Sequence, residues 1–337
     1  MRKSFIGAAL VGVLALAGCS APAEPGEQPD DAITVDTPIG EPEKTTLTIA
    51  LSAPNVDSQA PVRIAIDQGF YEEEGLTIEI IDADNAREGL VGGSLDLAVD
   101  GSVNLVDAAA AGTGITIVAG YRQREPFLIA ARNSVQQPSD LEGKQIILGD
   151  APGTPRVELR ETLLAEAGFD LSGVNFQAVF PPGFSNAWVE NFVQGQVEMT
   201  VLFPRHIPLI EEADGYLILE ELKEWPNDSL AATESWVEQN PNTLARFIRA
   251  TMKGIEIYKD LSQKDYVLEL MEGLDFTVTD AMRTDLVYAY GPLLYDTDMG
   301  LNEASFREAL EAEGAEAPEW SVYTNTVNLE RAQRSAE

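Results

Sequence analysis

The residues best suited to chemistry in this 337-residue chain lie in loops that lead from an expected strand into an expected helix. In the loop 149–156 (GDAPGTPR), Thr154 is typical of a helix N-cap and Pro155 of a first helical residue. Backbone N–H groups at such a helix start lack helical partners and attract anions, and Arg156 can add two parallel donors. Asp150 opposes an anion unless it points away. The loop predicts an anion-binding helix start; the alternative is an ordinary capped helix with Arg156 in solvent.

Four similar junctions supply the remaining candidates, because ligands of parallel α/β sheets bind beyond the carboxyl ends of the strands. Three aromatic side chains near these ends could enclose an apolar ligand, although each could equally pack in a core. Arg205 and His206 begin one of the helices, and Arg122 and Arg124 are further candidates. The predicted ligand-binding residues are Ser52, Asn55, Ser58, Gln59, Gly101, Ser102, Tyr121, Gly153, Thr154, Arg156, Asn186, Trp188, Phe203 and Arg205.

Catalytic and metal-binding residues are scarce. The chain has one histidine and one cysteine, and it contains neither a Gly-x-Ser-x-Gly nor a His-Glu-x-x-His motif, so triad hydrolysis and zinc chemistry lack their parts. Two acidic loops fail the calcium-binding pattern, one at Ala98 and one at Gly300. We therefore expect no enzyme activity, no metal site and no cofactor; chemistry by carboxylates alone is the enzymatic alternative.

The elements that must position these loops alternate between strand and helix. Strands are expected at 46–51, 76–81, 95–99 and 115–119, and helices at 58–67, 86–91 and 103–111. Ser58 is the expected N-cap of the first helix. Repeated strand-helix units imply largely parallel sheets covered on both faces. A body of about 290 residues exceeds the usual size of one hydrophobic core and indicates two lobes.

Five segments carry a family resemblance when they are taken in order. They are 61–81 (PVRIAIDQGFYEEEGLTIEII), 92–120 (GGSLDLAVDGSVNLVDAAAAGTGITIVAG), 140–154 (DLEGKQIILGDAPGT), 187–198 and 236–258. Together they resemble the substrate-binding proteins of ABC importers, in the branch that handles sulfonates, nitrate and thiamine-precursor pyrimidines. The resemblance covers about residues 46–325. It implies an α/β fold of the two-lobed periplasmic-binding-protein type II, in which each lobe is a mainly parallel sheet flanked by helices and two strands cross between the lobes.

The same resemblance divides the chain into parts. The crossover strands are expected at 127–131 and 229–233. Lobe 1 then takes 46–130 together with 228–325, lobe 2 takes 131–227, and 326–337 is left as a C-terminal tail. The ligand is expected in the cleft between the lobes.

The N-terminal residues predict where the protein resides. Cys19 follows Leu16-Ala17-Gly18 at the end of an apolar run that opens with two basic residues. These are the parts of a secretory signal peptide, too short to span a membrane, so residues 1–18 are expected to be removed. The resemblance to a lipobox implies lipid on Cys19 and an extracytoplasmic bacterial protein anchored to the cell membrane. Residues 19–45 are acidic and rich in proline, which predicts a disordered tether.

The strong acidity of the chain restricts its partners. It has 56 acidic and 22 basic residues and a formal charge of −34, which disfavours nucleic acid and anionic membrane surfaces. The sequence predicts a monomeric receptor that delivers a small organic anion, a sulfonate or carboxylate, to an ABC permease with its ATPase. A neutral thiamine-precursor pyrimidine stacked on Trp188 is the alternative ligand. A sensor or scaffold lipoprotein of the same fold is the alternative function.

Overall fold

The structure, a computed structural model, describes residues 33–81, 85–182 and 184–336. The predicted signal peptide, Cys19 and the first part of the predicted tether lie outside these ranges. The chain from Thr34 onward forms one compact unit. Within the described ranges, none of the helices combines the length and the apolarity that crossing a membrane requires.

Eight strands form one hydrogen-bonded sheet in the order β2-β1-β3-β8-β4-β7-β5-β6. The strands are β1 (Thr46–Ala50), β2 (Thr77–Ile80), β3 (Leu97–Gly101), β4 (Ile115–Arg132), β5 (Gln145–Ile146), β6 (Gln177–Ala178), β7 (Met199–Leu202) and β8 (Gly215–Thr233). At one end of the sheet β1 is parallel to β2 and β3, and at the other end β5 is parallel to β6 and β7. Lobe 1 is named here for the end with β1–β3 and lobe 2 for the end with β5–β7. The predicted α/β class is confirmed.

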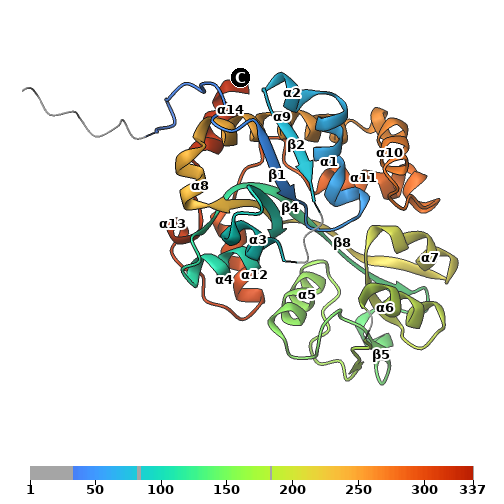
Figure 1. Cartoon of the computed structure of the whole chain (residues 1–337). Coiled ribbons are helices and arrows are strands. Elements are labelled where there is room, and N and C mark those ends of the chain that lie inside the picture. The colour runs from blue at the N-terminus through green and yellow to red at the C-terminus, as the bar shows by residue number, and fades with distance from the viewer. Residues whose placement is uncertain (1–32, 82–84, 183, 337) are drawn as a thin grey trace, which may run out of the picture. The chain divides into compact units, whose positions relative to one another are not determined.

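Helices cover both ends of this sheet (Figure 1). They are α1 (Val56–Asp67), α2 (Phe70–Glu73), α3 (Ala86–Gly92), α4 (Ser102–Ala110), α5 (Pro155–Glu166), α6 (Phe184–Val193), α7 (Ile207–Glu212), α8 (Glu234–Gln239), α9 (Pro241–Lys259), α10 (Lys264–Gly273), α11 (Asp285–Leu293), α12 (Glu303–Ala312), α13 (Trp320–Tyr323) and α14 (Val327–Ala336). Figure 1 shows α5, α6 and α7 gathered around the strands of lobe 2. Separate hydrophobic clusters fill the two lobes, which is the arrangement that the length of the chain predicts.

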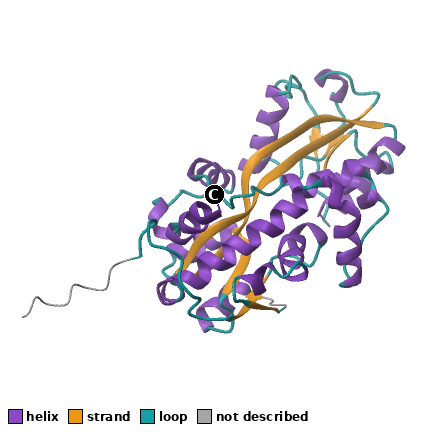
Figure 2. Ribbon diagram, turned by 90° about the horizontal axis from the view of Figure 1, so that it is seen from above, coloured by secondary structure: helices purple, strands orange, loops and turns teal. Residues whose placement is uncertain are grey.

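The two long strands β4 and β8 connect the lobes. They are antiparallel, pairing from Ile115 with Thr233 to Arg132 with Gly215, and Figure 2 shows them running through both ends of the sheet. The predicted crossovers at 127–131 and 229–233 lie inside the cores of lobe 2 and lobe 1, respectively. The chain therefore passes between the lobes earlier on β4, at about 122–126. Register shifts and charged residues mark this passage because it bridges two cores.

The first helix begins two residues before the predicted start. Asn55, rather than Ser58, is the N-cap of α1, and its side chain accepts a hydrogen bond from the backbone N–H of Ser58 at 3.0 Å. Pro61 lies inside α1 and has no N–H to offer the carbonyl of Asp57, four residues before it. The Tyr295 hydroxyl donates to that carbonyl instead, so the proline leaves no unpaired group there.

Two terminal segments pack against lobe 1. The first is the end of the predicted tether, in contrast to its expected disorder, and the second is the C-terminal stretch, for which the sequence allows a short helix or a loose tail. The strap, residues 34–45, is the described end of the predicted tether. Within it, Glu43 accepts hydrogen bonds from the backbone N–H groups of Asn242 and Thr243 at the start of α9. Most of the predicted tail forms α14, whose Leu329 and Ala332 are buried in the core of lobe 1. The folded body thus begins near Thr34 rather than near Thr46.

Candidate functional site

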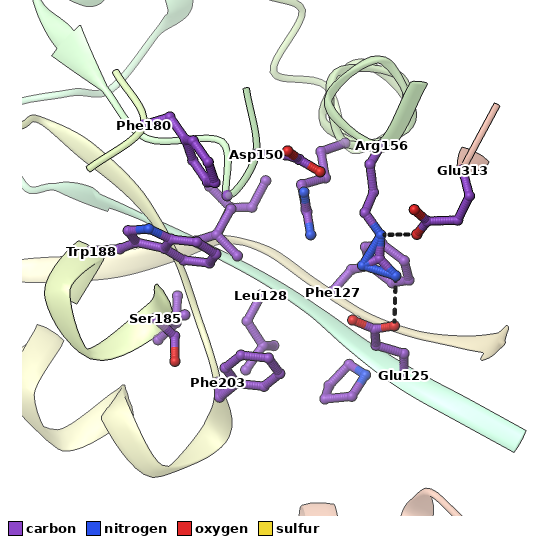
Figure 3. A pocket seen from close by; sticks show the side chains of 16 residues that line it. Glu125, Phe127, Leu128, Asp150, Arg156, Phe180, Ser185, Trp188, Phe203 and Glu313 are labelled. Atoms are coloured by element: carbon purple, nitrogen blue, oxygen red, sulfur yellow. Dashed lines mark hydrogen bonds and ion pairs between the residues drawn. The ribbon is translucent and has the colours of Figure 1, made fainter. Parts of the chain in front are cut away.

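A cavity of about 450 Å³ lies where the lobe 2 strands end beside the crossing segment of β4. The loops after β5 and β6, the ends of β7 and α12, and helices α5 and α6 complete its wall (Figure 3). Its lining residues are Glu125, Pro126, Phe127, Leu128, Ile129, Gly149, Asp150, Arg156, Arg160, Phe180, Ser185, Trp188, Val201, Leu202, Phe203 and Glu313. The carboxyl ends of parallel strands are where ligands bind in sheets of this kind.

One part of the wall is aromatic. Trp188 is nearly buried, and its indole N–H donates to the Pro181 carbonyl at 3.2 Å. The ring of Phe180 lies 6.1 Å from that of Trp188, centre to centre, and Phe203 is partly exposed on the same cavity. Trp188 also belongs to the hydrophobic core of lobe 2, so only a small part of its ring lines the cavity, and its indole N–H already has a partner.

The opposite part of the wall carries charge that is already paired (Figure 3). The Nε of Arg156 lies 3.0 Å from an oxygen of Glu313, and another guanidinium nitrogen lies 3.7 Å from Glu125. The same guanidinium stacks over the Trp225 ring at 5.6 Å. Arg156 is therefore neither a solvent-exposed residue nor an unpaired anion receptor, the two possibilities that the sequence left open.

A second arginine lies deeper in the wall. Arg160 is buried and donates a hydrogen bond to the carbonyl of Leu148 at 2.9 Å. Burial and the neighbouring charge of Arg156 lower the pKa of Arg160 to about 10, although Glu125 and Asp150 oppose this shift. The cavity thus brings two guanidinium groups together with the carboxyl groups of Glu125, Asp150 and Glu313.

The start of α5 has the form that the sequence predicted. Thr154 is its N-cap and Pro155 its first residue, but the Thr154 side chain makes no capping hydrogen bond. The buried Thr154 hydroxyl oxygen also has no hydrogen-bond partner in the described structure. Asp150 lies on the cavity near Arg160, so this helix start faces a mixed rather than a purely positive environment.

Three predicted residues, Arg156, Trp188 and Phe203, line the cavity and the other predicted residues do not. Several of these have structural partners: the Ser102 and Ser229 hydroxyl oxygens lie 2.8 Å apart, and the Tyr121 hydroxyl donates to the Ser58 carbonyl. The predicted residues outside the lining are Ser52, Asn55, Ser58, Gln59, Gly101, Ser102, Tyr121, Gly153, Thr154, Asn186 and Arg205. Their part in ligand binding stays a prediction.

Sequence reasoning missed the residues that complete the wall. Phe180 comes from the loop after β6, Glu125 from the crossing segment and Glu313 from the end of α12. Arg160 lies one helical turn beyond Arg156, a spacing that places both side chains on one face of α5 and that could have indicated it. No local pattern marks Glu125 or Glu313, because only the tertiary fold brings them to the cavity.

His206, the one histidine of the chain, gives a direct test of the geometry beside this cavity. Its Nδ1 accepts from the Phe203 N–H at 3.2 Å and its Nε2 lies 2.9 Å from the Asn186 Oδ1, which requires a neutral ring protonated on Nε2. Burial and then the charge of Arg205 lower the pKa of His206 to about 4 from 6.5. We expect its proton NMR signals to titrate near pH 4, and a midpoint near 6.5 would contradict this packing.

The same shift predicts the direction of a pH effect on stability. Between about pH 4 and 6.5 the unfolded chain binds a proton at His206 that the folded chain does not. The stability that neutral His206 contributes is therefore complete above about pH 6.5 and is lost as the pH falls toward 4.

Comparisons with known proteins agree with the fold. A family model described as NMT1/THI5 like matches residues 57–261, more than half of the chain. The binding protein YtlA of Bacillus subtilis is 24% identical over 288 residues, covering 82% of this chain and 85% of its own. The nitrate/nitrite binding protein NrtA of Synechocystis sp. is 23% identical over 314 residues, covering 80% of this chain and 68% of its own.

A solved structure has the same architecture. The periplasmic sulfonate-binding protein SsuA from Methylobacillus flagellatus superposes with a TM-score of 0.63 at 16% sequence identity, covering 87% of this chain and 95% of that one. The periplasmic-binding-protein fold that the sequence predicted is thereby confirmed. The chain therefore belongs to the NMT1/THI5-like family.

Proposed function

We propose that this chain is an extracytoplasmic receptor, anchored through lipid on Cys19, that captures a small flat organic molecule for an ABC permease. The aromatic wall of the cavity, formed by Phe180, Trp188 and Phe203, carries the proposal for the ligand. A volume of about 450 Å³ suits a small organic molecule. The Leu16–Cys19 pattern supports the anchor, and labelled fatty acid on the wild-type protein but not on Cys19→Ser would test it.

The charges of the cavity favour a neutral ligand over the sulfonate or carboxylate that the sequence suggested first. Three carboxyl groups and two guanidinium groups line it. An anion would have to displace Glu313 from Arg156, where the two groups are 3.0 Å apart, and would then lie beside Asp150 and Glu125. A neutral heteroaromatic ring stacks on Trp188 without breaking that pair. The neutral alternative therefore requires less rearrangement.

The pairing of Arg156 with Glu313 also suggests how binding is coupled to closure. Arg156 belongs to α5 of lobe 2, whereas Glu313 ends α12, whose Phe306 and Leu310 pack in a hydrophobic cluster with β3 of lobe 1. Ala309 and Ala312 of the same helix pack in the lobe 2 cluster, so the pair adds to a contact that α12 already makes with both lobes. A ligand that contacts both sides would favour closure of the lobes, and the permease would then recognise the closed form.

Thermal-shift screening followed by calorimetry tests the proposal. Neutral aminopyrimidines and other heteroaromatic compounds should raise the melting temperature of residues 34–337 more than sulfonates, carboxylates or nitrate do. Trp188→Ala should then weaken the best ligand by about 10- to 100-fold, because stacking on an aromatic ring contributes about 1–3 kcal/mol.

Trp320→Ala is the matched control. Trp320 packs edge-on against Phe306 and Tyr323 and does not line the cavity, so affinity should not change. Stabilisation by sulfonates alone would favour the anionic ligand instead. A complete absence of stabilisation, or unchanged affinity in Trp188→Ala, would contradict the proposed site.

A further inference from the structure

Glu125 presents a carboxyl group in the cavity wall that the protein does not satisfy. The residue is 9% exposed, and its Oε2 has no hydrogen-bond partner among the described residues. The nearest guanidinium nitrogen of Arg156 is 3.7 Å away, too far for a hydrogen bond. A buried acceptor left unpaired is unfavourable, so a bound molecule that donates a hydrogen bond to it gains affinity.

Each of the two neighbouring guanidinium groups already donates a hydrogen bond to another partner. Arg156 donates to Glu313 at 3.0 Å and stacks over Trp225, and Arg160 donates to the Leu148 carbonyl. The geometry therefore keeps both guanidinium groups close enough to balance the charge of Glu125 but not to hydrogen-bond its Oε2. A molecule that enters the cavity can supply the missing donor.

Glu125 can accept a hydrogen bond whether or not its carboxyl group is protonated. Burial raises the pKa of Glu125, the charges of Arg156, Arg160 and Arg122 act in the opposite direction, and Glu313 adds to the rise. An ionised carboxylate accepts through both oxygens, and a protonated one still accepts through its carbonyl oxygen. An N–H donor suits both forms, whereas an anion suits only the protonated form, whose O–H it can accept.

Glu125 lies on the side of the cavity opposite the aromatic wall. It lies on β4, a strand paired along its length with β8, and Figure 3 shows it across the cavity from Trp188. A flat molecule stacked on Trp188 therefore extends its edge toward the carboxyl group. We infer that Glu125 is the specificity-determining residue of the cavity, and that it selects neutral heteroaromatic ligands carrying an N–H donor, such as an amino group, on the ring edge. This inference rests on the proposed function.

A matched pair of probes tests the inference. 4-Aminoquinazoline and 4-methylquinazoline have similar shapes, but only the first carries an exocyclic N–H donor. The wild-type protein should bind the amino compound at least about tenfold more tightly by calorimetry, because a hydrogen bond to a charged group contributes about 1.5–3 kcal/mol. Glu125→Met keeps the length of the side chain and removes the acceptor, so it should bind the two compounds about equally.

Two further variants separate recognition from folding. Glu125→Gln keeps an acceptor oxygen in the same place and should retain a smaller preference for the amino compound. Glu272→Met removes a carboxylate that pairs with Arg283 outside the cavity lining and should leave the preference at the wild-type value. Because the readout is a ratio of two affinities, a general loss of stability does not reproduce it.

The outcomes distinguish the two proposals. Equal binding of both compounds by the wild-type protein, or an unchanged preference in Glu125→Met, would overturn the role of Glu125 while leaving the heteroaromatic receptor intact. Failure of the wild-type protein to bind either compound, or any member of the heteroaromatic panel, would overturn the proposed ligand class and this role with it.

Discussion

Gly254→Ala should lower the free energy of unfolding by about 3 kcal/mol, measured by urea denaturation. Gly254 lies inside α9, where that helix crosses α1 in the core of lobe 1. A Cβ at this position would overlap the carbonyl oxygen of Pro61 and would lie 3.0 Å from the Cβ of Ala65. Because the obstacle is backbone rather than a flexible side chain, the two helices would have to move apart and unpack their buried side chains.

Gly273→Ala is the matched control. Gly273 is the last residue of α10, and an added Cβ there would meet nothing within 4 Å. Alanine should stabilise this position by about 0.5–1 kcal/mol, since it favours helix over the unfolded chain. Equal effects of the two substitutions would show that helix propensity, rather than contact between α1 and α9, governs the role of Gly254.

The local pattern of apolar and polar residues predicted most helices and strands of lobe 1, but it did not predict the length of the two central strands. The strand expected at 115–119 continues to Arg132, as β4. The polar run from Arg122 to Glu125 interrupts the apolar pattern by which a strand is identified, and pairing with β8 keeps it extended nevertheless. The crossing between the lobes was misplaced for the same reason, since it falls in this polar run rather than in the apolar run after it.

The candidate site was predictable only where its residues come from strand ends. Trp188, Phe203 and Arg156 were found because the carboxyl ends of parallel strands define a common edge. Glu125 and Glu313 come from a crossing strand and a distant helix, and their approach to Arg156 depends on tertiary packing. Those carboxyl groups carry the proposal of a neutral ligand, and tertiary packing rather than a local sequence pattern brings them to Arg156.

The strap was predicted as disordered because its composition cannot form a core by itself. In the structure the strap contributes little apolar surface to the core. Its ordered position depends on its own backbone groups, to which residues of α9 and α14 hydrogen-bond. Asn242 accepts a hydrogen bond from the Gly40 N–H at 2.9 Å, and Glu43 accepts from the start of α9. The order of the strap therefore depends on residues 200 or more positions later in the chain as well as on Glu43 of the strap itself.

Arg331→Met should lower the free energy of unfolding by about 3 kcal/mol and release the strap, measured by urea denaturation and by hydrogen exchange at residues 34–45. Arg331 is only 2% exposed, and it donates to the carbonyls of Thr37 and Pro38 at 3.0 and 2.9 Å and to that of Pro241. Methionine fills a similar volume but removes the donor from the buried Pro241 carbonyl and from the partly buried hydrogen bonds to Thr37 and Pro38. Arg334→Met is the matched control, since Arg334 on the same helix is exposed and pairs with Asp36 at the surface, where such pairs contribute about 0–1 kcal/mol. Unchanged exchange of the strap in Arg331→Met would contradict this account, because it would mean that the strap is held by its own conformation or by Glu43 alone.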